Sequence, residues 1–204
     1  GNASMGDQTG RDGIEFFQKI GKYFQEGFAA TDYATAQAMF LDGQSAMYYI
    51  GDWEIAAMQE AYENGTIDYF YLPTQEGALT GANEFCVNSG IGMAFNTETF
   101  DEKTKDFVNY IIENYGKIYA GMDQMTPIKS DLPEDHEFSD LYLKVRDDMG
   151  NIGEHFLKPW DCYLDSNTCT VVNDNALLLA TGDIDEDTFV DMVDSALEEY
   201  KSGF

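Results

Sequence analysis

The sequence predicts an α/β fold in which a mainly parallel sheet is covered by helices on both faces. Two short apolar runs rich in aromatic residues, SAMYYI at 45–50 and DYFYLP at 68–73, have the length of buried strands. The segment between them, WEIAAMQEAYEN, has apolar residues at helical spacing. A helix that joins two strands indicates a βαβ unit, and therefore a parallel pair of strands.

Two helices are predicted before the first strand. Apolar residues recur on one face of 13–28, and Gly27 is expected to end this helix. The residues of this apolar face are Ile14, Phe17, Ile20, Phe24 and Phe28. Asp32 is expected to cap a second helix at 33–41, which Gly43 would end.

The second half of the chain adds one strand and more helices. A strand is predicted at 85–95, where two glycines interrupt it, and a helix at 101–120 with a break at Gly116. The remaining predicted helices lie at 137–149, 170–182 and 186–200. Val190, Val193 and Leu197 form the buried stripe of the last one.

Composition excludes several classes of partner. The chain has 204 residues, of which 44% are apolar and 14% aromatic, so it can bury a core and is globular. Its 38 acidic and 11 basic residues give a formal charge of -27. Such a surface repels phosphate backbones and anionic lipid headgroups, so nucleic acid is not an expected partner. No apolar run is long enough to be a membrane helix.

No cofactor, metal site or catalytic cluster is predicted. His136 and His155 are isolated and are interpreted as surface residues, and no CxxC spacing suggests zinc. Cys86 is interpreted as a small buried hydrophobe, whereas Cys162 and Cys169 are close enough for a disulfide, which stays open.

The acidic run at 183–189 alternates as a calcium loop does. It lacks the glycine and the glutamate that such a loop needs, because Thr188 and Asp194 stand at those positions. We interpret the run as the start of a helix, with Asp183 or Asp185 as its cap.

The tripeptide Gly51-Asp52-Trp53 combines an aromatic ring with a carboxylate just after the first predicted strand. Open α/β sheets place their ligand clefts at the carboxyl ends of strands. There, an indole can stack on the C–H patches of a sugar, and Asp52 can accept from a hydroxyl. The alternative is that Trp53 covers the core and Asp52 only caps the helix, and the residues alone do not decide between them.

The stretch MFLDGQSAMYYIGDWEI resembles the pattern "F..G.aAM...G.W" of extracellular solute-binding proteins of ABC importers, the sugar-binding type that includes maltodextrin-binding members. The resemblance continues through DYFYLP, NSGIGMAFNTETFDEKTKDFVNYI, TPIKSDL and the terminal TGDIDEDTFVDMVDSALEEY. Each motif is degenerate, and their order over residues 13–204 carries the resemblance.

This resemblance implies a periplasmic-binding-protein-like, two-lobed fold, of which the chain is a partial copy, the C-terminal half. Residues 1–12 would be a tag or linker, and 13–82 the βαβ core of the C-terminal lobe. Residues 83–136 would cross the hinge and supply elements of the N-terminal lobe. Residues 137–204 would return to the C-terminal lobe.

The resemblance also implies a set of ligand contacts. Trp53 corresponds to the tryptophan that commonly stacks on the sugar, with Tyr49 and Asp52 as neighbours. Asn88 and Ser89 follow the predicted hinge and could donate to hydroxyls, or they could form only a polar kink. Trp160 and Asp161 lie in a region from which the family often contributes another aromatic residue.

The expected function is capture of a carbohydrate outside the cell and delivery to the permease subunits of an ABC transporter, by hinge closure around the ligand. The protein is expected to be a lipoprotein on the outer face of a bacterial membrane, not an enzyme. Two alternatives stay open: an acidic glycoside hydrolase, and an interaction module without a small-molecule ligand. A lobe without its partner would expose apolar surface, so association of copies is also expected.

Overall fold

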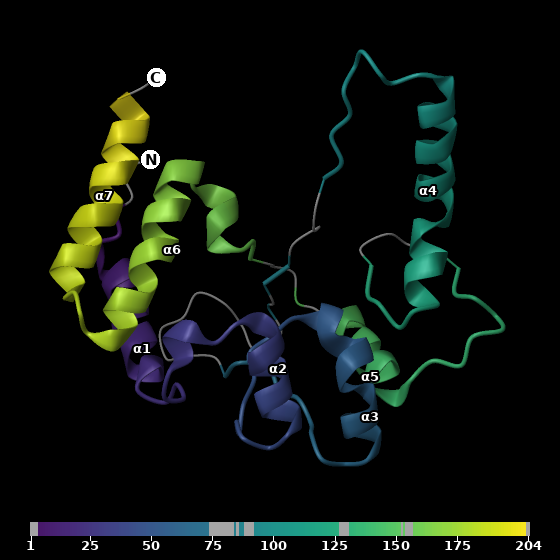
Figure 1. Cartoon of the computed structure of the whole chain (residues 1–204), viewed down its shortest axis with the longest axis horizontal. Helices are drawn as coiled ribbons and strands as arrows, with labels where there is room; N and C mark the ends of the chain where they lie inside the picture. Colours follow the sequence, from purple (N-terminus) through teal and green to yellow (C-terminus); the bar gives the residue numbers. More distant parts are fainter. Residues whose placement is uncertain are drawn as a thin grey trace. The chain divides into compact units, whose positions relative to one another are not determined.

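A computed structural model of the protein describes residues 4–73, 84, 86–87, 92–126, 131–151, 153 and 157–202. The chain forms two compact units, Gly1–Met39 with Pro159–Phe204 and, separately, Phe40–Lys158. Figure 1 traces the helices in chain order, from purple at the N-terminus to yellow at the C-terminus. Each unit contains a hydrophobic cluster of its own. The proposed assignment of residues to lobes, with borders at 83 and 137, stays a prediction.

In the first unit, the regular structure of the described residues is helical. Its elements are α1 (Gln8–Gly21), η1 (Phe28–Ala30), α2 (Tyr33–Leu41, whose last two residues belong to the second unit), η3 (Trp160–Tyr163), α6 (Ser166–Thr181) and α7 (Glu186–Ser202). Helices α1, α6 and α7 contact one another, as Figure 1 shows. Their shared core consists of Ile14, Val172, Leu179, Phe189, Val190 and Val193.

The predicted stripe of the last helix is confirmed. Val190 and Val193 are 6% and 1% exposed, and Leu197 packs against the same cluster. The first predicted helix, 13–28, is displaced along the chain, because α1 begins at Gln8 and ends at Gly21 instead of near Gly27. Phe24 and Phe28 still pack edge to face with ring centroids 5.0 Å apart, so a turn rather than a helix brings the predicted apolar side chains together.

The predicted caps are also confirmed. The backbone N–H of Thr35 donates to Asp32 before α2, and that of Thr188 donates to Asp185 before α7, each at 2.8 Å. These bonds satisfy backbone donors that the first helical turn leaves without a partner. Gly43 follows α2 with φ of 71°, the left-handed conformation that glycine adopts without strain.

The second unit contains η2 (Asp52–Glu54), α3 (Ile55–Glu63), α4 (Glu102–Ala120) and α5 (Asp140–Gly150). Helices α3 and α5 pack against each other, as Figure 1 also shows. Their buried contact consists of Ile55, Met58, Leu141 and Tyr142. Partly buried side chains from 40–48, 67–69 and 125–145 surround this contact.

Helix α4 is continuous, so the predicted break at Gly116 is wrong. Asp101 caps the helix by accepting from the backbone N–H of Thr104 at 2.8 Å. A glycine inside a helix keeps its backbone hydrogen bonds and costs only about 1 kcal/mol relative to alanine. Gly116 is buried, and the helix runs through it to Ala120.

The predicted α/β fold is wrong for the described residues, which contain helices but no strand and no sheet. The segments 45–50 and 68–73 run without a ladder partner. The one β-bridge between described residues is parallel, from Cys86 to Leu157, and the N–H of Val87 donates to the carbonyl of Leu157 at 2.7 Å. Most of the third predicted strand, 85–95, lies outside the described residues or carries no strand assignment.

Each of these two segments nevertheless has one side chain that packs on the core and neighbours that do not. Tyr48 is half-buried while Met47 and Tyr49 are exposed, and Tyr69 is half-buried while Phe70 is exposed. Tyr48 and Tyr69 pack on the α3–α5 cluster. The segments therefore have one packed face and one exposed face, not the buried faces expected, and a sheet also needs backbone partners that no local pattern specifies.

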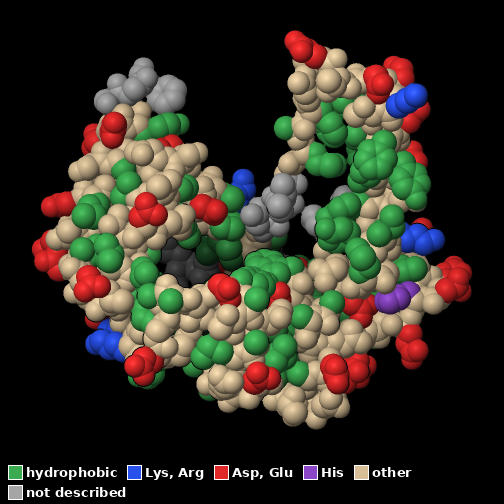
Figure 2. Space-filling view, viewed as in Figure 1, with side chains coloured by type: hydrophobic (Ala, Val, Ile, Leu, Met, Phe, Trp, Pro, Cys, Tyr) green, Lys and Arg blue, Asp and Glu red, His purple; other side chains and the backbone are tan. Residues whose placement is uncertain are grey.

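The exposure of the cysteines differs from the prediction, whereas the spread of acidic side chains agrees with it. Cys86 is exposed, contrary to its interpretation as a buried hydrophobe, and Cys162 and Cys169 are free thiols. Figure 2 shows acidic side chains scattered over the visible face, as their spread along the sequence suggests. The same view shows hydrophobic side chains along α4, where Phe107, Tyr110 and Ile112 are each about 60% exposed.

Candidate functional site

Trp53 is a surface side chain on a firmly anchored backbone. It lies in the middle of η2, from which α3 continues directly at Ile55. The next two residues, Glu54 and Ile55, are only 7% and 4% exposed, whereas Trp53 is 60% exposed. The core therefore holds the segment in place while the indole faces solvent.

The glycine two residues before Trp53 has a steric role. A Cβ atom built on Gly51 would lie 2.2 Å from Cζ3 of Trp53, a distance that no real side chain tolerates. The backbone of Gly51 is extended, with φ of -99°, so its conformation does not demand glycine. Glycine leaves free the space that the indole occupies, and a larger residue at position 51 would require the ring to move.

Asp52 is a half-buried carboxylate beside this indole. Burial raises the pKa of Asp52, and the backbone N–H groups of Asp52 and Trp53 partly oppose that effect. The carboxylate forms no ion pair with any described residue. It is therefore a hydrogen-bond acceptor and a negative charge that the described protein groups leave uncompensated.

Tyr69 and Tyr71 come from the extended segment that follows α3. Their rings meet edge to face with centroids 5.6 Å apart. The hydroxyl of Tyr69 donates to the carboxylate of Asp148 on α5. Burial and this hydrogen bond raise the pKa of Tyr69 well above its ordinary range, so the phenol stays protonated and remains a donor.

Lys144 lies one helical turn before Asp148 on α5 and is fully engaged. Its ammonium is 2.8 Å from Oδ1 of Asp68 and 4.5 Å from the ring centroid of Tyr69. The ring of Tyr62 lies on another side, with its centroid 5.4 Å away. An ion pair and two cation–π contacts thus fix this side chain over the aromatic segment.

Tyr71 connects this group to the Gly51-Asp52-Trp53 segment. Burial is the main cause that raises the pKa of Tyr71, and the charges of Asp148 and Asp52 also act to raise it. Both carboxylates therefore lie within electrostatic reach of the same phenol. We define Asp52, Trp53, Tyr69, Tyr71 and Asp148 as the aromatic–carboxylate site.

Sequence reasoning found only part of this site. Asp52 and Trp53 were predicted, whereas Tyr69, Tyr71 and Asp148 were not. The spacing of Tyr69 and Tyr71 by two residues in an extended segment was a usable signal, because such residues share one face. Asp148 gave no signal, since only the packing of α5 brings it to Tyr69.

The other predicted contacts have different surroundings. Tyr49 is 80% exposed in the segment before η2. Asn88 and Ser89 lie outside the described residues. Trp160 begins η3 in the first unit and is 47% exposed, and Asp161 beside it is also exposed.

His136 is not an ordinary surface residue, contrary to its interpretation from the sequence. Its Nε2 lies 2.7 Å from Oδ1 of Asp123, which is only 5% exposed. Asp123 also accepts from the backbone N–H of Ser139, the cap of α5, at 3.0 Å. This arrangement ties the end of α4 to the start of α5. His155 lies outside the described residues.

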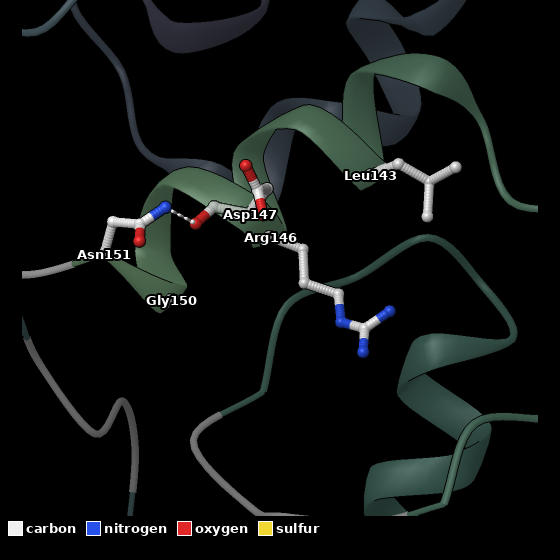
Figure 3. Close-up of a pocket in the computed structure, with 5 residues that line it drawn as sticks. All are labelled: Leu143, Arg146, Asp147, Gly150 and Asn151. Atoms are coloured by element: carbon white, nitrogen blue, oxygen red, sulfur yellow. Dashed lines mark hydrogen bonds between the residues drawn. The ribbon is translucent and has the colours of Figure 1, made fainter.

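A separate hollow of about 510 Å³ lies on another face of α5. Leu143, Arg146, Asp147, Gly150 and Asn151 line it, and all are exposed. Figure 3 shows Arg146 extending from the helix, and Asn151 donating to the backbone carbonyl of Asp147 at 2.9 Å. Because the hollow contains no aromatic ring and no buried polar group, the aromatic–carboxylate site is the stronger candidate.

Comparison with known proteins assigns the family. A profile described as bacterial extracellular solute-binding protein matches residues 2–142, which is more than half of the 204 residues. The chain belongs to the bacterial extracellular solute-binding protein family. No curated protein gives a significant match.

Membership confirms the coarse part of the functional prediction. Solute-binding proteins of this family bind a small molecule outside the cell for transport and are generally non-enzymatic. Among the described helices, none is both long enough and apolar enough to span a membrane. Within the described residues, no three His, Cys, Asp or Glu side chains are grouped to hold a metal ion.

The matched span contains most of the aromatic–carboxylate site of this solute-binding protein. Asp52, Trp53, Tyr69 and Tyr71 lie inside residues 2–142, and Asp148 follows closely after it. Trp160 and Asp161 lie beyond the matched span.

Proposed function

We propose that this solute-binding protein captures a carbohydrate outside the cell for delivery to the permease subunits of an ABC importer. The observation that supports this function is the exposed indole of Trp53 beside the half-buried carboxylate of Asp52. Sugars present flat C–H patches between hydroxyl groups. Trp53 would stack on such a patch while Asp52 accepts from a hydroxyl.

The surrounding residues fit the same chemistry. Tyr71 would add a second ring and a hydroxyl, and the hydrogen-bonded pair of Tyr69 and Asp148 would add polar groups next to Tyr71. Tyr49, 80% exposed, supplies a further ring from the preceding segment. Aromatic side chains have few rotatable bonds, so ordering them on binding costs little conformational entropy, and their flat faces match the C–H patches of a sugar ring.

Several finer points belong to this proposal. Asn88, Ser89, Trp160 and Asp161 are proposed as additional ligand contacts. The protein is proposed to be of the maltodextrin-binding type and to be lipid-anchored. The chain is proposed to correspond to the C-terminal half of a protein of that type. Association of copies is proposed as well, and the exposed apolar side chains of α4 support it.

Tryptophan fluorescence can test the function site by site, because the chain has two tryptophans. In the Trp160→Phe variant, Trp53 is the sole tryptophan reporter, and in Trp53→Phe only Trp160 reports. Each variant is titrated with oligosaccharides of glucose, N-acetylglucosamine and glucosamine. We expect a saturable emission change in Trp160→Phe, and binding weakened by about tenfold or more in Trp53→Phe.

Calorimetry on the unmodified chain provides a second readout with the same ligands. Absence of both heat and emission change with every sugar would reject carbohydrate capture. Release of smaller sugars during the titration, detected by chromatography, would instead favour the glycoside hydrolase alternative. Equal binding by the unmodified chain and Trp53→Phe would remove Trp53 from the site.

A further inference from the structure

Asp52 is a carboxylate without an ion-pair partner among the described residues. It is half-buried beside an exposed aromatic ring. Transfer of a carboxylate out of water is unfavourable unless a partner compensates its charge. A ligand that brings a positive charge to Asp52 would supply that compensation.

Lys144, a cation that acts on the site, already has a carboxylate partner. Lys144 acts on the same phenol of Tyr71 as Asp52 does, but its ammonium is bound to Asp68 at 2.8 Å. The carboxylates of Asp148 and Asp52 act on this phenol, and because the ammonium of Lys144 is neutralised by Asp68, these two carboxylates leave a formal charge of about -2. The local balance therefore disfavours an anionic ligand and favours a cationic one.

The aromatic rings strengthen this preference. The faces of indole and phenol rings carry partial negative charge and attract ammonium groups, most strongly in the case of tryptophan. Trp53 is 60% exposed and Tyr71 is 38% exposed, so both rings can be reached from solvent. The protein as a whole, with a formal charge of -27, would also draw cations toward its surface and repel sugar acids and sugar phosphates.

We propose that the aromatic–carboxylate site recognises a sugar that carries a free ammonium group, an amino sugar, with the ammonium at Asp52 and the ring stacked on Trp53. This inference rests on the proposed carbohydrate-binding function and names the ligand class of the same site. Neutral sugars of the same shape would bind through stacking and hydroxyl contacts alone. Acidic sugars would bind least.

Three oligosaccharides with the same linkage and length isolate the charge. The β-1,4-linked oligomers of glucose, N-acetylglucosamine and glucosamine differ at C2, where they carry a hydroxyl, an acetamide or an ammonium. Calorimetry in a mildly acidic buffer keeps the amine protonated. We expect the glucosamine oligomer to bind roughly tenfold more tightly than the other two, because an ion pair and a cation–π contact are added.

Two variants locate the preference. Asp52→Asn keeps the size and hydrogen-bonding capacity of the side chain but removes its charge, and we expect it to abolish the preference for the amine. Asp147→Asn removes the same charge from an exposed position on α5 that has no part in the site, and we expect it to keep the preference. Circular dichroism and thermal unfolding establish that both variants are folded.

The outcomes separate this inference from the function on which it rests. If the neutral oligomers bind as tightly as the amine, carbohydrate capture stands and the amino-sugar assignment is overturned. If Asp52→Asn and Asp147→Asn reduce the preference equally, the effect is long-range and the placement at Asp52 is overturned. If none of the three oligomers binds, both the function and the ligand class are rejected.

Discussion

The indole of Trp53 occupies the side-chain space of Gly51, since a Cβ atom at Gly51 would lie 2.5 Å or less from both Cζ3 and Cη2 of the ring. The missing side chain at Gly51 therefore makes room for the ring in this position, even though most of the ring is in solvent. The pattern of a glycine two residues before a tryptophan thus has a physical cause in this chain. Glycine allows a rotamer of Trp53 that a side chain at position 51 would obstruct.

Replacement of Gly51 by alanine should displace the indole while the fold is kept. We expect Gly51→Ala to weaken sugar binding by about tenfold, close to the effect of Trp53→Ala, because the ring can no longer occupy its position. Calorimetric titration of both variants measures the effect. An affinity unchanged in Gly51→Ala would show that the observed ring position is not the one that binds.

Gly13→Ala is the matched control for this substitution. A Cβ atom at Gly13, inside α1, meets nothing within 4 Å. Alanine there should leave sugar affinity unchanged and raise the free energy of unfolding by roughly 0.5–1 kcal/mol through its better helix propensity. A loss of affinity in both variants would point to a general effect of the added methyl group.

Asp123 should make the second unit sensitive to acid. Burial acts to raise the pKa of Asp123, but hydrogen bonds from His136 and Ser139 outweigh it, and the pKa is lowered from its ordinary value of 3.8. Because the pKa of Asp123 is lower in the folded state than in the unfolded state, the ionised carboxylate stabilises the fold at pH values above the unfolded-state pKa. This stabilisation is lost as the pH falls through the folded value, because the unfolded state then binds the proton more readily.

The Asp123→Asn variant tests this pH dependence. Asparagine also tolerates the left-handed backbone of Asp123, whose φ is 53°, so the charge is the main change. We expect the free energy of unfolding to fall by about 1–3 kcal/mol at neutral pH, and this difference from the unmodified protein to become smaller below about pH 4. Urea unfolding at a series of pH values gives the comparison. A loss that stays constant with pH would mean that the charge of Asp123 does not contribute.

Local signals in the sequence predicted the helices better than the sheet. The helix at 33–41 has its cap, Asp32, and its terminator, Gly43, within the same short stretch, and its bounds were predicted correctly. A strand differs because its hydrogen bonds go to a partner elsewhere in the chain. Tyr48 of the apolar run at 45–50 packs on the α3–α5 cluster, but such a run could not show that a partner strand exists.

The residues of the candidate site also differ in whether local sequence could predict them. Asp52 and Trp53 could be proposed because ring and carboxylate are adjacent in the sequence. Tyr69 and Asp148 are 79 positions apart and meet only because the extended segment packs on α5. The pairing of Asp123 with His136 is likewise tertiary, so a histidine that looked isolated in the sequence has a buried partner.

The Tyr69–Asp148 hydrogen bond should contribute to stability as well as to the site. Tyr69→Phe removes the donor and leaves the part-buried carboxylate of Asp148 without it, so we expect a loss of about 1–2 kcal/mol in the free energy of unfolding. Urea unfolding provides the measurement. Tyr23→Phe is the control, because Tyr23 is 85% exposed and its hydroxyl can be replaced with no measurable change. Equal losses in the two variants would contradict a role for the bond.

Two adjacent leucines of α6 offer a matched test of the first unit's core. Leu179 is 2% exposed and belongs to the cluster shared by α1, α6 and α7, whereas Leu178 is 37% exposed. Leu179→Ala should therefore lower the free energy of unfolding by about 3 kcal/mol, since it removes buried methyl groups and leaves a cavity. Leu178→Ala should cost less than half as much, because much of its side chain is already in water. Helix propensity changes equally in both variants, so the difference between their unfolding midpoints measures burial alone. Similar midpoints would mean that α6 does not pack through Leu179 in solution.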